Sequence, residues 1–155
     1  MELKWYGHAS FKLTSEDGFR IVTDPYSPEL AGYAPFREEA ELTIASSFND
    51  AFHDRVDLVP GSPVKVNALD IVAEGGTKTI SGINFQAMLT HEKWQHPDKD
   101  NPDANAMYRF EIDGMAIGHM GDVGNPLDEQ QQDFLQHLDI LLTLAGDVPT
   151  IRLPD

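Results

Sequence analysis

The chain has 155 residues, 26 of them acidic and 11 basic, which gives a net charge of −15. This length allows one domain with a sizeable core and is too short for two ordinary ones, so we expect a single domain over residues 1–155. A surface this acidic repels phosphate backbones and anionic lipid headgroups, and we therefore expect no nucleic acid and no membrane as partner. The acidity would also suit a salt-adapted organism, although a merely soluble acidic protein is the simpler interpretation.

Cysteine is absent, which excludes disulfides, thiolate zinc sites and a cysteine nucleophile. Any metal must therefore bind through His, Asp or Glu. The first residues, "MELKWYGHASFKL", alternate polar and apolar side chains and lack the features of a secretory signal, while the longest apolar run, residues 140–145, is far below a membrane span. We expect a cytoplasmic protein.

The N-terminal part predicts antiparallel strands at residues 3–6, 10–13 and 19–23, with an Asp17-Gly18 hairpin turn between the last two. Three prolines then make residues 24–35 a loop. Residues 41–46, "ELTIAS", form the next strand and lead directly into the polar loop 47–54. Loops that follow strands at this end are where α/β folds usually place their chemistry.

The middle of the chain predicts short antiparallel strands, and the last third a hairpin, a helix and a strand. The strands are expected at 64–66, 69–73, 77–80 and 83–89, the hairpin at 107–119, the helix at 127–138 and a buried central strand at 140–144. Between them, residues 90–106 form a polar loop of a length that is usually functional or mobile.

Two segments imitate known motifs but fail on their chemistry. "GHMGDVG" at 118–124 follows a strand as a dinucleotide fingerprint would, but its glycine spacing differs and Asp122 would face the pyrophosphate. "DKDNPD" at 98–103 alternates acids like a calcium loop, yet it lacks the turn glycine and the distal Glu. We interpret the second as a solvated loop.

The strongest candidate site is dispersed over four residues that follow different strands. Asp50 and His53 follow the strand at 41–46, His91 follows a second strand, and Asp122 follows a third. Carboxylate oxygens and imidazole nitrogens gathered from several strand ends are what a zinc, manganese or iron site requires. Each residue alone is more simply a solvated or turn residue, so spacing by itself does not decide between these interpretations.

Several segments in their order resemble the metallo-β-lactamase superfamily, in its branch of metal-dependent hydrolases related to the L-ascorbate-6-phosphate lactonase. The resemblance covers essentially the whole chain, and its most specific pieces are "DGMAIGHMGDVGNPL", "GHASF" and "TDP". It implies an α/β fold, the αββα sandwich of mainly antiparallel or mixed sheets, with one or two metal ions at the edge between the sheets. The family also carries a final His on a strand beyond "IRLPD", so we expect the last strand and helices to be missing.

The resemblance assigns the family's metal loop, His-x-His-x-Asp-His, to residues 48–53. Phe48 and Phe52 then stand where the family has His and Asp, while Asp50 and His53 keep ligand positions. His91 falls at the family's third His and Asp122 at its metal-bridging Asp. Because Phe52 replaces both a ligand and a proton acceptor, we expect one divalent ion (zinc, manganese or iron) or none.

The resemblance therefore implies a hydrolase of ester, lactone or phosphoester bonds with a degenerate active site. Asp50, His53, His91 and Asp122 are its predicted metal ligands, His53 and Asp122 its predicted catalytic residues, and a small molecule its substrate. The alternatives are a non-catalytic binding module of the same fold and a fragment of an active hydrolase. We further expect Phe48 and Phe52 to turn inward, and His8 and His119 either to line the pocket or to serve structure. The face of the sheet that contains the apolar strand at 140–144 should be covered by a second copy of the chain in a homodimer.

Overall fold

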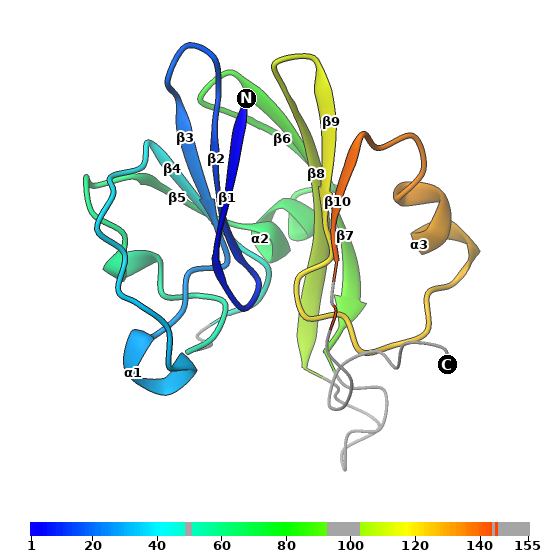
Figure 1. The fold of residues 1–155 in the computed structure, drawn as a ribbon. Coiled ribbons are helices and arrows are strands. Elements are labelled where there is room, and N and C mark those ends of the chain that lie inside the picture. The colour runs from blue at the N-terminus through cyan, green and yellow to red at the C-terminus, as the bar shows by residue number, and fades with distance from the viewer. Residues whose placement is uncertain (49–50, 93–102, 144, 146–155) are drawn as a thin grey trace.

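Two five-stranded sheets face each other (Figure 1), as expected of this fold class. The computed structural model describes residues 1–48, 51–92, 103–143 and 145. The first sheet has the order β1-β2-β3-β4-β5, made of β1 (Glu2–Gly7), β2 (Ser10–Thr14), β3 (Arg20–Thr23), β4 (Leu42–Ala45) and β5 (Val64–Asn67). The second has the order β10-β9-β8-β7-β6, made of β6 (Thr77–Ile80), β7 (Ile83–His91), β8 (Ala104–Ile112), β9 (Met115–His119) and β10 (Ile140–Leu142).

The strand directions bring the ends of several strands to one edge of the sandwich. In the first sheet β3, β4 and β5 run parallel, and β1 runs with them because two antiparallel pairings separate it from β3. In the second sheet β7, β9 and β10 share one direction for the same reason. The two sheets are joined at this edge, where the Ala106 amide donates to the Ser46 carbonyl over 2.8 Å. Loops after β4, β7 and β9 therefore meet, although they are distant in sequence.

The helices are short. They are α1 (Pro28–Ala31), α2 (Ala68–Ala73) and α3 (Glu129–Phe134), with a 3-10 turn at Val56–Leu58. The prediction of a strand at 69–73 was wrong, because these residues form α2. Asn67 caps the helix by accepting a hydrogen bond from the Leu69 amide, and Ala68, Leu69 and Ile71 form its buried side. β5 was also assigned wrongly, since it runs parallel to β4.

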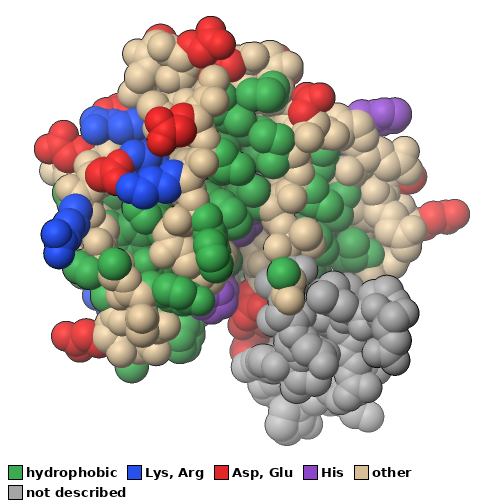
Figure 2. All heavy atoms as spheres, viewed as in Figure 1, with side chains coloured by type: hydrophobic (Ala, Val, Ile, Leu, Met, Phe, Trp, Pro, Cys, Tyr) green, Lys and Arg blue, Asp and Glu red, His purple; other side chains and the backbone are tan. Residues whose placement is uncertain are grey.

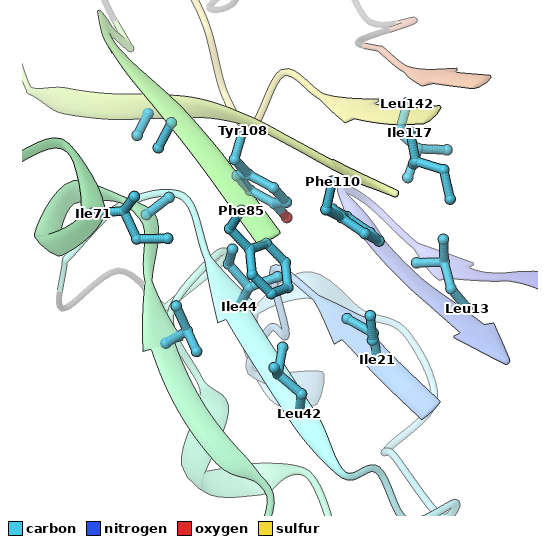
Figure 3. Packing of buried hydrophobic residues seen from close by; sticks show 14 of the residues in the cluster. Leu13, Ile21, Leu42, Ile44, Ile71, Phe85, Tyr108, Phe110, Ile117 and Leu142 are labelled. Atoms are coloured by element: carbon cyan, nitrogen blue, oxygen red, sulfur yellow. The ribbon is translucent and has the colours of Figure 1, made fainter. Parts of the chain in front are cut away.

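The main core fills the space between the sheets (Figure 3). Alternate residues of the strands point inward, and those of the first sheet meet aromatic rings of the second. The labelled side chains of this core include Leu13, Ile21, Leu42, Ile44, Ile71, Phe85, Tyr108, Phe110, Ile117 and Leu142. Phe85 and Phe110 pack with their centroids 5.1 Å apart.

The outer face of the second sheet is covered by α3 and its flanking residues. Met107 points outward while its neighbour Tyr108 points inward, and Met107 joins a cluster with Met120 and Val123 under Phe134. Arg109 fixes the helix end by donating to the Phe134 carbonyl over 2.7 Å, an interaction that suits a cation at a helix C-terminus. The loop after β9 is therefore packed, through Met120 and Val123, against the outer face of the second sheet.

β10 lies at the edge of the second sheet in the described part of the chain, whereas a central strand was predicted for residues 140–144. Leu142 is buried, whereas the side chain of Leu141 is 41% exposed. The strand is therefore exposed at Leu141 in the single chain. None of the helices in the described ranges has the length and hydropathy needed to cross a membrane.

Candidate active site

His53 and Asp122 meet at the edge where the two sheets join. His53 comes from the loop after β4 and Asp122 from the loop after β9, and the distance between His53 Nε2 and Asp122 Oδ2 is 4.0 Å. The His53 side chain is 2% exposed and that of Asp122 17%. An imidazole and a carboxylate are thus held close together with limited access to water, a setting that strengthens their mutual electrostatic interaction.

The position of His53 is set by backbone hydrogen bonds on either side of it. The Ser27 amide donates to the Ala51 carbonyl over 2.7 Å, and the Arg55 amide donates to the Pro25 carbonyl over 2.8 Å. The loop after β4 is therefore tied to the loop after β3. These bonds hold the backbone on both sides of His53.

Asp122 is held through Asn105 and Gly121. The Asp122 amide donates to Asn105 Oδ1 over 3.0 Å, while Asn105 Nδ2 donates to Thr90 Oγ1 and to the Met120 carbonyl. Gly121 adopts φ +63°, and a Cβ built there would lie 2.3 Å from Asn105 Oδ1 and 2.6 Å from Ser46 Cβ. Only glycine allows this close approach.

A buried carboxylate, Asp24, organises the centre of the edge. Asp24 accepts hydrogen bonds from the Ser46 amide and hydroxyl, over 3.0 and 2.6 Å, and its own backbone has φ +38°. The Tyr108 hydroxyl donates to it over 3.4 Å. Burial, followed by the nearby Asp24 carboxylate, raises the pKa of Tyr108 well above its usual range. Tyr108 therefore stays protonated and serves as a donor.

His119 joins the two sheets as a neutral imidazole. Its Nδ1 accepts from the Gly121 amide over 2.9 Å, so its Nε2 carries the proton and donates to the Ala9 carbonyl over 2.9 Å. Its ring stacks on Tyr108 with centroids 4.9 Å apart. Burial lowers the pKa of His119, with the Asp24 charge opposing this effect. The neutral form is the one that both hydrogen bonds require.

His91 ends β7 beside the loop that carries Asp122. Its amide donates to Asn125 Oδ1, and its carbonyl accepts from the Gly124 amide. Its Nδ1 is buried and makes no hydrogen bond to the residues that the structure describes, so the donor chemistry of a metal ligand is available there. Asp50 lies outside the described residues.

The described residues of the predicted metal centre are of the right chemical types to bind a metal, but they are too few to hold one by themselves. Histidine nitrogens and a carboxylate are appropriate ligands for zinc, manganese or iron. The described residues, however, contain no group of three His, Asp or Glu side chains close enough to hold one ion. The predicted ligand Asp50 lies outside these residues, so the described side chains alone do not complete the predicted centre.

Phe48 and Phe52 do not turn inward, and that prediction was wrong. Their side chains are 52% and 38% exposed. Phe52 packs at its edge against His8, with ring centroids 5.6 Å apart, and the His8 ring lies 4.9 Å from that of His53. The core between the sheets is already filled by strand residues, and the Phe52 ring lies at the rim of the site through its contact with His8.

A cavity of about 550 Å³ opens beside this rim, and both His8 and His119 line it. Figure 2 shows hydrophobic side chains gathered over the hollow between the sheets, with histidine at its lower end. Both histidines border this cavity, whose described lining does not include His53, His91 or Asp122. His119 also has the structural role that was its alternative.

Several residues that position the site, above all Asp24, Ser46 and Asn105, were not among those predicted from the sequence. Asp24 had a usable signal, because it follows a buried strand and precedes a proline within "TDP". Ser46 directly follows β4 and begins the segment that leads to His53. Asn105 had no signal, since it lies at the end of a polar segment with many similar residues.

Comparison with known proteins identifies the fold family. The model of the family described as the β-lactamase superfamily domain matches residues 2–155. No match to a curated protein was found. A proposed Zn-dependent hydrolase of the metallo-β-lactamase superfamily from Thermotoga maritima is 27% identical with a TM-score of 0.61, over 90% of this chain and 58% of its own.

Two further solved structures share the fold at lower identity. A proposed metal-dependent hydrolase from Parabacteroides distasonis is 20% identical with a TM-score of 0.71, over 97% of this chain and 72% of its own. One from Veillonella parvula is 11% identical with a TM-score of 0.60, over 90% of this chain and 71% of its own. The present chain therefore spans little more than half of the Thermotoga protein. With the family model covering nearly every residue and two facing mixed sheets in place, the chain belongs to the metallo-β-lactamase superfamily.

Proposed function

We propose that this chain is a metal-dependent hydrolase of an ester, lactone or phosphoester bond whose metal site is reduced to one ion. The observation that carries the proposal is the pairing of His53 and Asp122, 4.0 Å apart at the edge of the two sheets. Family membership and the names of the similar structures support the hydrolase class. Phe48 and Phe52, at positions where the resembled motif has ligands, support the reduction to a single ion.

The roles follow from the donor chemistry of each residue. Asp50, His91 and Asp122 would hold one divalent ion, which supplies Lewis acidity and makes water acidic enough to react near neutral pH. His53 is the candidate base, because its imidazole lies beside Asp122 and can accept a proton. Asn105 and Gly121 are positioning residues, since they fix the backbone of Asp122.

Metal content tests the proposal directly. Protein purified without chelator is expected to hold up to one equivalent of zinc, manganese or iron by elemental analysis, and His91→Ala should lose it. His137→Ala is the matched control, because His137 is exposed and distant from the site in sequence. Equal metal content in the two variants would show that His91 is not a ligand.

Phe52→Asp tests the reduction of the site. The substitution adds a carboxylate at the loop position where the resembled motif has one, so it should tighten zinc binding in calorimetric titration. Phe52→Asn provides a control for the loss of the ring without the charge. If both variants bind zinc as the unaltered chain does, residue 52 does not face a metal centre.

The second candidate function is a non-catalytic binding module of the same fold. Exposed Phe48 and Phe52 favour it, because apolar side chains at the rim can bind a ligand without cleaving it. Protein that holds no metal after incubation with zinc, manganese or iron, and that hydrolyses no ester or lactone, would establish this alternative.

A further inference from the structure

The cavity beside His8 and His119 has the size and the walls of a small-molecule site. Its volume of about 550 Å³ lies within the range of about 300 to 1,000 Å³ typical of ligand pockets. Large apolar side chains supply most of the wall, namely Trp5, Phe11, Leu30, Tyr33, Phe52 and Leu142. The His8 ring at its base is 4.9 Å from that of His53, which connects the cavity to the candidate active site.

No charged side chain lines the cavity among the described residues. The nearest basic groups in the first sheet are already engaged, because Lys4 and Lys12 both pair with Glu38. The chain as a whole carries a net charge of −15. A phosphate or carboxylate would therefore meet no lysine or arginine in the described wall, which offers only the imidazoles of His8 and His119. The negative charge of the whole chain would also repel such an anion.

The aromatic wall is held in place before any ligand arrives. Trp5 Nε1 donates to the His8 carbonyl over 2.9 Å, and the Trp5 ring meets Tyr33 edge to face with centroids 6.4 Å apart. The Tyr33 ring lies over Gly7, where an added Cβ would come within 2.5 Å of it. Tyr26 backs Tyr33 at 5.5 Å. A ring entering the cavity would thus meet aromatic surfaces that need little reordering, which favours affinity.

Exposed apolar side chains are concentrated at this cavity rather than scattered. Nine large hydrophobic side chains are exposed among the described residues, and four of them, Trp5, Leu30, Tyr33 and Phe52, line it. Trp5 is 61% exposed. Such a concentration on a protein surface usually marks a binding site.

We propose that this cavity binds an uncharged, flat aromatic group of the substrate. The inference about substrate rests on the proposed hydrolase function. Within that function it favours neutral aryl esters or lactones as substrates and disfavours phosphoesters. Aromatic faces and edges favour an aryl ring over an aliphatic chain of equal size, because ring pairs gain attraction beyond the area they bury. Aromatic faces and the negative net charge would also attract an organic cation. The described wall, however, holds no carboxylate to pair with one, so the neutral ring is the proposed occupant.

Binding of a neutral aryl fluorophore tests the proposal without any need for turnover. The probe is 6-propionyl-2-dimethylaminonaphthalene, titrated with the full chain in the presence of a chelator, so that metal and hydrolysis play no part. Its emission should shift to the blue at a stoichiometry of one, and 2-naphthol should displace it. Glucose 6-phosphate and tetramethylammonium should not.

Variants locate the bound probe. Trp5→Ala and Tyr33→Ala should each weaken binding about tenfold, because each removes a stacking surface together with apolar area, while Trp5→Phe should restore most of the affinity. Leu89→Ala is the matched control, since Leu89 is 43% exposed and outside the cavity. Equal binding by all these variants, or displacement by tetramethylammonium or glucose 6-phosphate, would overturn the proposal. Aryl binding with no metal uptake would leave it standing and contradict the hydrolase function alone.

Discussion

The position of Asp122 depends on Gly121, whose backbone packs closely against Asn105 and Ser46. A side chain at this position would be destabilising for two reasons. The backbone φ is +63°, which strains residues other than glycine, and an added Cβ would lie only 2.3 Å from Asn105 Oδ1. Gly114 offers a matched control, because its φ is +73° but nothing lies within 4 Å of an added Cβ. We expect Gly114→Ala to lower the free energy of unfolding by about 1 to 2 kcal/mol and Gly121→Ala by about 2 to 5 kcal/mol in urea denaturation. Similar losses for the two variants would mean that the loop moves away at little cost.

His119 should make the stability of the chain depend on pH. Because burial lowers its pKa in the folded state, the unfolded chain takes up a proton first as the pH falls. The stabilisation from neutral His119 is therefore fully present above the unfolded value of about 6.5, and it is lost as the pH falls from there to the lowered folded pKa, with a slope of about 1.4 kcal/mol per pH unit. Unfolding of the parent chain and of His119→Gln at several values between about pH 7.5 and 5 measures this. The variant should show the shallower dependence, and parallel curves would contradict the assignment.

For individual residues, the sequence is a good guide to which side chains can take part in chemistry. It is a poorer guide to the direction in which those side chains point. His53 and Asp122 were selected from residue type and resemblance, and they lie 4.0 Å apart. Phe48 and Phe52 were expected inside because they are apolar. Their exposure depends on how completely other strands fill the core, which no local pattern contains.

At the scale of elements, Asn67 links α2 to the loop that leads into the candidate site. Its Oδ1 caps the helix at Leu69, and its Nδ2 donates to the Ser47 carbonyl over 2.7 Å. Asn67→Asp keeps the cap and loses the donor, so it should cost about 1 kcal/mol, whereas Asn67→Ala loses both and should cost about 2 kcal/mol. Thermal unfolding of the two variants distinguishes these effects. Equal losses would show that the cap at Leu69 contributes nothing measurable, and no loss in Asn67→Asp would show the same for the Ser47 contact.

The same helix shows why sequence patterns fail for short elements. "LDIVA" is rich in residues favoured in strands and was predicted as one, but a six-residue helix offers too few turns to display a helical period. The asparagine immediately before it was the available signal. The hairpin around Asp113 and Gly114 was predicted correctly because its turn and the alternation of β8 are local. The parallel pairing of β5 with β4 was not predicted, because it depends on how segments distant in the sequence pack together.

For the whole molecule, the net charge of −15 should make stability increase with salt. Like charges repel most strongly in the compact state, and raising NaCl from about 0.05 to about 0.5 M shortens the screening length from about 14 to about 4 Å. We expect the melting temperature to rise at pH 7 by about 2 to 4 °C for each kcal/mol of repulsion removed. Near the sequence pI of about 4.5 the increase should vanish. An equal increase at both pH values would indicate a general salt effect instead.

Dimerisation through the second sheet would depend both on the packing of that sheet and on the net charge of the chain. We propose that two copies pair along β10, because this strand lies at the edge of the described sheet and Leu141 exposes 41% of its side chain. Two chains of charge −15 repel, so the dimer should be more populated at high than at low NaCl in sedimentation at micromolar concentration. Leu141→Lys should abolish it by placing a charge in the contact. Leu89→Lys is the control, since that exposed leucine belongs to β7 in the interior of the same sheet. A chain that stays monomeric at high salt, or a dimer that both variants weaken equally, would rule out pairing along β10.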